Sequence, residues 1–274
     1  MTLRIAWLTT GRGPGSYGAL EYVCRAIASG LPVDIATVFL NRAPGEAEPT
    51  DRLVAMARSH GCHVDTLSSV AFRKSRGGTI SRAGEPLQPW RIEFDEAAAN
   101  VLARHDFEVG VMFGYMLIAT KPLYERFRFI NDHPALPDGP VGTYEEVIAH
   151  LIHEQAHESG CMMNTVTGNV DRGPALSYCR FPIRDAKNEA LWIQHDFGAS
   201  PKQLETSLLY LDLRQRGVQR ERPFLVETLR AVAAGELELT PNSPLDLTNV
   251  VEQELKRPGA GGQGARSGVS SRHA

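Results

Sequence analysis

The sequence has no long apolar segment, no CxxC pair and no strong excess of charge. No apolar run reaches membrane-spanning length, and the start MTLRIAWLTTG has the pattern of a strand rather than a signal peptide, so we expect a cytoplasmic protein without membrane contact. A net charge of -3 gives no electrostatic reason to expect nucleic acid as a partner. The cysteines lie far apart in the sequence, so we expect reduced, mostly packed thiols and no cysteine nucleophile: Cys24, Cys62, Cys161 and Cys179.

What is present is typical of an ordinary globular protein. The 274 residues, 42% hydrophobic and 22% charged, suffice to bury a core in one large domain or two small ones. Beyond about residue 256 the chain consists mainly of Gly, Ser, Arg and Ala, with too little apolar surface to offset the entropy of ordering. We therefore expect a main α/β domain over residues 1–240 and a C-terminal extension over 241–274 that is largely disordered beyond about 256.

Hydrophobic periodicity predicts strands that alternate with helices. Leu3–Thr9 and Val33–Leu40 are apolar enough for buried strands, and helical spacing between them up to Gly30 indicates a βαβ unit. A surface loop or lid is predicted over residues 70–89, which are basic and rich in Gly and Pro. Further strands are predicted at 62–67, 109–113, 162–167 and 175–182, and further helices at 51–60, 94–104, 143–158, 200–216 and 223–234.

A glycine-rich segment, TGRGPGSYG over residues 10–18, separates the first strand from the first helix. Glycines at such a junction leave backbone N–H groups free at a helix N-terminus, where an anion is stabilised. The spacing departs from GxGxxG because Pro14 and two further residues intervene. This loop alone leaves both a phosphate site and an ordinary turn open.

The segment FINDHP over residues 129–134 places an amide and an imidazole two residues apart. If Phe129 and Ile130 end a strand, Asn131 and His133 point the same way from its carboxyl end, where open α/β sheets bind ligands. Pro134 restricts His133 to extended geometry. The pair suits proton transfer around a polarised carbonyl, but a loop-capping Asn and a surface His also explain it.

A second motif, HExxH at residues 153–157, resembles a zinc-protease signature. On a predicted helix it would place His153 and His157 one turn apart with Glu154 beside them. The extended form of the motif requires a third histidine where this chain has Met163, and a thioether is a poor zinc ligand beside two imidazoles. We interpret the motif as a polar helix surface, keep a zinc hydrolase as a remote alternative, and expect no metal.

The order of these motifs resembles that of the folate-dependent formyltransferases, in particular the phosphoribosylglycinamide formyltransferases of purine biosynthesis. The likeness spans about residues 3–237, and its most specific part is Asn-x-His-Pro followed about forty residues later by Asp-x-Gly-Pro. It implies an open, doubly wound, mostly parallel sheet of the Rossmann-like formyltransferase type, with C-terminal helices. The matching segments are IAWLTTG at 5–11, GYM at 114–116, NDHP at 131–134 and NVDRGP at 169–174.

The resemblance implies a one-carbon transferase that moves a formyl group from 10-formyltetrahydrofolate to a small, phosphorylated primary amine, glycinamide ribonucleotide above all. Asn131, His133 and Asp171 would form the catalytic group: Asn131 and a protonated His133 would stabilise the oxyanion, and Asp171 would favour the charged imidazole. Glu221 would face the substrate sugar. The substrate phosphate would be held by Gly11, Arg12, Gly13, Gly15, Ser16 and Tyr17, and the folate by Met116, Leu117, Ile118, Thr167, Gly168, Asn169 and Val170.

Several departures from the family pattern leave the acceptor open. The phosphate loop is longer, with Tyr17 in place of the usual Asn, and Asp132 replaces an apolar residue between the catalytic pair. Leu117 stands where a basic residue is common. A different amine, such as an amino sugar or a natural-product intermediate, is therefore an alternative, as is hydrolysis of the formyl folate. The sequence does not decide between a monomer and a homodimer.

Overall fold

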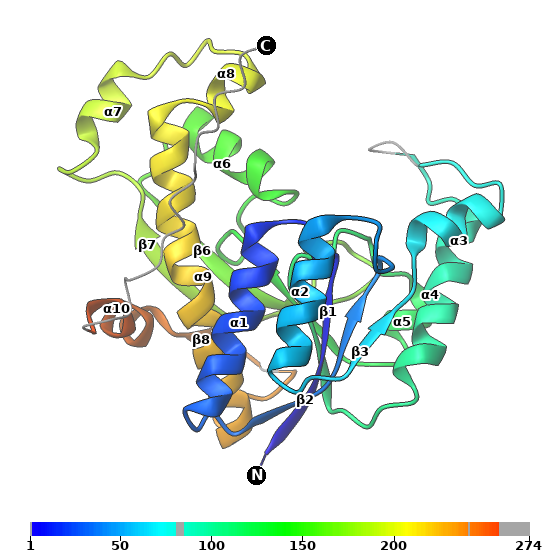
Figure 1. Cartoon of the computed structure of the whole chain (residues 1–274). Coiled ribbons are helices and arrows are strands. Elements are labelled where there is room, and N and C mark those ends of the chain that lie inside the picture. Colours follow the sequence, from blue (N-terminus) through cyan, green and yellow to red (C-terminus); the bar gives the residue numbers. More distant parts are fainter. Residues whose placement is uncertain (1, 81–84, 241, 258–274) are drawn as a thin grey trace.

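The computed structural model describes residues 2–80, 85–240 and 242–257, which form an α/β fold around one eight-stranded sheet (Figure 1). The strand order is β3-β2-β1-β4-β5-β6-β7-β8; only β6 runs antiparallel to both of its neighbours, and the other paired strands are parallel. This confirms the predicted open, mostly parallel sheet. The strands are β1 (Leu3–Thr9), β2 (Val33–Leu40), β3 (Val64–Thr66), β4 (Val109–Met112), β5 (Phe129–His133), β6 (Glu158–Thr165), β7 (Ala175–Pro182) and β8 (Leu245–Asp246).

Helices cover both faces of the sheet, as a doubly wound fold requires. One core packs beneath α1, α2, α6 and α9, and a second packs beneath α3, α4 and α5 (Figure 1). Along β5, Phe129 belongs to the second core and Ile130 to the first, because side chains alternate across a strand. The helices are α1 (Pro14–Ala28), α2 (Glu48–Ser59), α3 (Ser69–Ser75), α4 (Pro89–Leu102), α5 (Lys121–Tyr124), α6 (Tyr144–His153), α7 (Glu189–Gln194), α8 (Pro201–Glu205), α9 (Leu208–Ala234) and α10 (Thr248–Lys256).

Two predicted segments have a different structure. The helix expected over 143–158 ends at His153, because Gln155 adopts a left-handed conformation (φ 49°) and Glu158 already begins β6. The segment 70–89 was predicted to be a loop, but its start lies in α3, whose N-terminus is capped by the Ser68 hydroxyl. Residues 81–84 of that segment lie outside the described residues.

The C-terminal helices also differ from the prediction. The two helices expected over 200–216 and 223–234 are a short α8 and a long α9, which continues through Pro223. Glu221, which falls between the two predicted helices, therefore lies within α9. Residues 245–256 add β8 and α10 to the structure, while residues 258–274, expected to be disordered, lie outside the described residues.

None of the helices in the described part of the chain combines the length and the apolar character needed to cross a membrane.

Candidate active site

Three side chains from two separate segments meet beside a cleft of about 2330 Å³ at the carboxyl edge of the sheet. Asn131 and His133 lie at the end of β5, and Asp171 lies on the turn between β6 and β7. The Asn131 amide nitrogen donates to Asp171 Oδ1 at 3.4 Å, and His133 Nδ1 lies 3.7 Å from Asp171 Oδ2. The residues predicted from two distant motifs are thus brought together in one constellation.

The hydrogen bond of the His133 ring fixes which nitrogen faces the cleft. His133 Nε2 lies 2.8 Å from the carbonyl oxygen of Pro140, and since a carbonyl only accepts, Nε2 carries the hydrogen. Nδ1 is left to face Asp171. The imidazole is only 2% exposed, so its orientation is set by the protein. The nitrogen that can exchange a proton with a ligand is therefore Nδ1.

Local backbone geometry explains the position of Asp171. It adopts a left-handed conformation (φ 52°), which Asp tolerates better than most residues. Two residues later, a Cβ on Gly173 would lie 1.7 Å from the carbonyl oxygen of Thr165, so only glycine allows the turn to approach β6 this closely. The Asp-x-Gly pattern thus supplies both the Asp171 carboxylate and the glycine that lets its turn pack against β6.

The glycine-rich loop forms another wall of the same cleft. α1 begins at Pro14 without a side-chain cap, and the Ser16 N–H lies in its uncapped first turn. Gly114, two residues after the end of β4, has a positive φ of 64°, and a Cβ there would lie 2.3 Å from Ser16 Oγ. This close approach brings the loop against β4. Of the predicted phosphate residues, all but Gly11 line the cleft.

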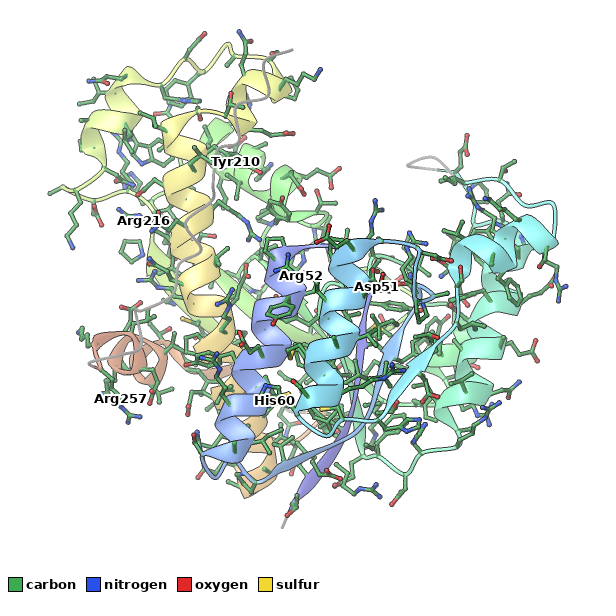
Figure 2. The ribbon with its side chains drawn as sticks, in the orientation of Figure 1. Asp51, Arg52, His60, Tyr210, Arg216 and Arg257 are labelled. Carbon is green, nitrogen blue, oxygen red and sulfur yellow. The ribbon has the colours of Figure 1, made fainter. Side chains whose placement is uncertain are left out.

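The cleft also carries basic side chains. Arg52 extends near the upper end of α2, and Arg257 lies at the end of α10 on the other side of α9 (Figure 2). Because both line the cleft, it extends well beyond the three converging side chains. Arg12, in the glycine-rich loop itself, is exposed beside it. The part of the cleft at the glycine-rich loop, where Arg12 is exposed, is suited to an anionic ligand.

A set of apolar side chains forms the opposite wall. Met116, Ile118 and Val170 expose 67%, 46% and 49% of their surface although they are large and hydrophobic. Exposed apolar side chains beside a cleft suit a flat ring system. All of the predicted folate-binding residues except Gly168 line the cleft: Met116, Leu117, Ile118, Thr167, Asn169 and Val170.

A buried ion pair holds the loop that carries this apolar wall. Arg91 and Asp95 of α4 are 4% and 0% exposed, and their side chains lie 3.3 Å apart. Arg91 donates to the carbonyl oxygen of Ile118 at 2.7 Å, and Asp95 accepts from the Thr120 N–H at 2.6 Å. Burial raises the pKa of Asp95, although Arg91 opposes the shift. These two hydrogen bonds hold the loop at Ile118 and Thr120 against α4.

Sequence reasoning missed two polar side chains of the cleft. Asn164 lies directly across from Asn131 in the β5–β6 pairing, is 2% exposed, and has no partner for its Oδ1. A lone amide in the apolar run CMMNTV was the signal that could have identified it. Arg214 donates to Glu221 Oε1 at 3.0 Å, and its guanidinium lies 3.9 Å from the centre of the Tyr144 ring. Arg214 and Glu221 are seven residues apart, a spacing of two helical turns that could have indicated an ion pair on one helix face.

The HExxH residues do not form a metal-ligand group. His153 ends α6, Glu154 caps it, and His157 follows a turn, so the two histidines do not share a helix. His153 is 79% exposed. In the described ranges, the group with metal-ligand geometry is His63, Asp65 and His105, which does not line the cleft.

Comparison with known proteins identifies the family. A family model described as formyl transferase matches residues 4–192. No curated protein sequence matches the chain.

Solved structures share the fold at low sequence identity. Glycinamide ribonucleotide transformylase 1 from Symbiobacterium toebii is 24% identical, with a TM-score of 0.62 and coverage of 89% of this chain and 95% of that one. Phosphoribosylglycinamide formyltransferase from Coxiella burnetii, in complex with CHES, is 20% identical with a TM-score of 0.58 (86% and 89% covered). The Campylobacter jejuni phosphoribosylglycinamide formyltransferase is 16% identical with a TM-score of 0.59 (85% and 98% covered).

Proposed function

Because this chain belongs to the formyl transferase family, we propose that it transfers a formyl group from 10-formyltetrahydrofolate to the primary amine of a small phosphorylated acceptor, with glycinamide ribonucleotide as the first candidate. The observation that supports this proposal is the convergence of Asn131, His133 and Asp171, from two segments about forty residues apart, beside one cleft. In acyl transfer to an amine, an amide N–H can stabilise the oxyanion and an imidazole with a neighbouring carboxylate can transfer the proton.

Asn131 stabilises the transition state in this proposal. When the amine attacks the formyl carbon, a tetrahedral centre forms and its oxygen becomes negative. The Asn131 amide nitrogen carries two hydrogens, of which one is donated to Asp171, and the other would hydrogen-bond to that oxygen. A single oxyanion donor contributes about 3–4 kcal/mol of transition-state stabilisation in such sites.

His133 and Asp171 handle the proton. The attacking amine must lose a proton, and N10 of the folate must gain one as the C–N10 bond breaks, so that one amide forms and tetrahydrofolate leaves. His133 Nδ1, next to the cleft, would carry this proton. The Asp171 carboxylate 3.7 Å away would stabilise positive charge on the ring while it does so.

The walls of the cleft position the two substrates. The uncapped N-terminus of α1 and Arg12 would hold the acceptor phosphate, and Glu221 its sugar. The exposed apolar side chains of Met116, Ile118 and Val170 would cover the pterin ring. Orientation by both walls would place amine and formyl carbon within reach, which contributes much of the rate in bimolecular transfers.

The test is a transfer assay with purified protein, 10-formyltetrahydrofolate and a panel of amines that includes glycinamide ribonucleotide and phosphorylated amino sugars. We expect tetrahydrofolate and a formylated amine in equal amounts. Asn131→Ala should reduce kcat by about 10²–10³-fold, whereas folate affinity stays near the wild-type value. Asn100→Ala, which removes an exposed amide on α4, is the matched control. Free formate in place of a formylated amine would instead indicate hydrolysis, and no consumption of the donor with any amine would refute the proposal.

A further inference from the structure

Two histidines and an aspartate from distant segments converge on the side of the sheet away from the cleft. His63 immediately precedes β3, Asp65 is the central residue of β3, and His105 lies between α4 and β4. The strands β3 and β4 run in the same direction in one sheet, so His63 and His105 both come from its amino edge, opposite the carboxyl edge that carries the cleft. None of the three side chains lines that cleft. The candidate active site therefore does not account for this group.

The atoms that could hold a metal ion already face one another. His63 Nε2 lies 3.4 Å from Asp65 Oδ1, and His105 Nε2 lies 2.6 Å from Asp65 Oδ2. With one donor atom taken from each residue, all three atoms lie within 4.8 Å of one another. Donor atoms around a tetrahedral zinc ion, each about 2.1 Å from the metal, are roughly 3.4 Å apart. The His63 side chain is 60% exposed, so it can move the remaining distance without disturbing the core.

Hydrogen bonds from the imidazoles to the carboxylate hold the same group together without an ion, but two observations favour a metal. Both imidazoles present Nε2 to the carboxylate, and within the described ranges neither Nδ1 has a hydrogen-bond partner. The ring hydrogen can therefore move to Nδ1 and leave Nε2 as a metal ligand. The arginine at the start of β1, Arg4, is held by Asp34 and Asp106, so it does not compete for Asp65.

We propose that His63, Asp65 and His105 bind a divalent transition-metal ion of the Zn²⁺ type, with solvent completing its coordination. Two imidazoles and one carboxylate suit zinc and its first-row neighbours, whereas Mg²⁺ and Ca²⁺ prefer oxygen ligands throughout. The ion would tie β3, an edge strand of three residues, to the turn that follows α4. Its role is structural and separate from formyl transfer, for which no metal is expected, so it does not depend on the proposed function.

The test is a calorimetric titration with Zn²⁺ of the full chain, treated beforehand with EDTA and dialysed. We expect the wild type to bind one equivalent with a micromolar or lower Kd. His63→Ala/His105→Ala should weaken this binding by at least about a hundredfold, because loss of a residue that only supports a metal ligand already costs roughly tenfold to a hundredfold. The matched control, His153→Ala/His157→Ala, removes the same number of histidines from the HExxH motif and should keep the wild-type affinity.

Thermal unfolding supplies a second readout. An ion that binds only the folded state raises Tm as its concentration increases, so Zn²⁺ should raise the Tm of the wild type and of the HExxH variant, and Mg²⁺ should not. The Tm of His63→Ala/His105→Ala should not respond to Zn²⁺. His63→Ala alone changes an exposed position and gives the same test with the least change to the fold.

Formyl transfer provides the control for a structural role. Protein treated with EDTA should keep its full kcat, because the three residues lie apart from the cleft. Absence of Zn²⁺ binding by the wild type, binding that is unchanged in His63→Ala/His105→Ala, or binding lost instead in the HExxH variant would overturn the proposal. A loss of transfer that Zn²⁺ restores would contradict the structural role.

Discussion

Two regions of the molecule each pair a carboxylate with an imidazole, and they differ in the contact distance and in whether a cleft lies beside them. Asp171 and His133 lie beside the cleft at the carboxyl edge of the sheet, 3.7 Å apart. Asp65 and His105 lie 2.6 Å apart at the other side of the fold, where His105 precedes β4. The contact between Asp65 and His105 is the shorter of the two, and no cleft lies beside it.

The environments of the two carboxylates explain this difference. Asp65 also accepts from the Thr37 hydroxyl at 2.8 Å and lies 3.4 Å from His63, so its hydrogen bonds are satisfied within the protein. Asp171 is held by a turn, with one long contact to Asn131 and one to His133. A site that must bind a ligand keeps its polar groups incompletely paired, and its contacts shorten when the ligand is present. Incomplete pairing next to a cleft is therefore more informative than a short distance.

The largest expected effect comes from removing the imidazole of each pair. His133→Ala should lower kcat/KM for formyl transfer by about 10²–10⁴-fold, because the group that carries the proton is lost. His105→Ala removes an equivalent side chain from the second region and should leave kcat/KM within about twofold. Steady-state kinetics with both substrates measure this. Equal losses in the two variants would show that the comparison of the two regions is wrong.

Neutralising the carboxylates should give a smaller difference. Asp171→Asn retains a residue that tolerates the left-handed backbone but removes the charge beside His133, and kcat should fall about tenfold to a hundredfold, the value of one charge-assisted hydrogen bond. Asp65→Asn should leave kcat nearly unchanged. Circular dichroism and thermal unfolding on both variants establish that the fold is intact. If Asp65→Asn lost the same activity, the two carboxylates would not be functionally distinct.

The same Asp65→Asn variant should instead change stability, in a pH-dependent way. Burial alone would raise the pKa of Asp65, but hydrogen bonds from Thr37 and His105 outweigh it and keep that pKa below its ordinary value of 3.8. The ionised form thus stabilises the folded state above about pH 4, and this contribution is lost as the pH falls through the lowered pKa.

The expected gap in the free energy of unfolding between wild type and Asp65→Asn is on the order of 1 kcal/mol at neutral pH, and it should narrow on acidification. Urea denaturation at several pH values measures it. All other carboxylates are present in both the wild type and the variant, so their titration cancels in the difference between the two free energies of unfolding. A gap that is constant with pH would mean that the charge of Asp65 contributes nothing.

Most strands of the sheet could be predicted from the sequence, because they depend on local patterns, but β8 was not predicted and β6 begins at Glu158, ahead of the segment expected over 162–167. The strands Leu3–Thr9, Val33–Leu40 and Ala175–Pro182 have the predicted bounds, since apolar runs ended by turn residues mark buried strands well. Asn131 and His133 were found through one short motif, and Asp171 was added through the family resemblance. Their roles are predictions that only the assays above can test.

Features that depend on tertiary contacts could not be predicted in this way. α9 continues through Pro223 because its flanking residues are buried against the sheet, which outweighs the local preference to end a helix there. The proximity of Asp132 to Glu221 arises from residues 89 positions apart in the chain and leaves no local signal. Asn164 gains its place opposite Asn131 only through the pairing of β5 with β6.

The smallest expected effect concerns the motif that is most conspicuous in the sequence. A zinc hydrolase would require His153 and His157 on one helix, yet α6 ends at His153 and a left-handed Gln155 separates the two histidines. Because neither lines the cleft, the double variant His153→Ala/His157→Ala should keep kcat/KM within about twofold of the wild type, the usual range for exposed positions. The assay is the same transfer reaction, compared with His133→Ala under identical conditions. A loss approaching that of His133→Ala would place essential chemistry at HExxH, and the cleft would then no longer account for the activity.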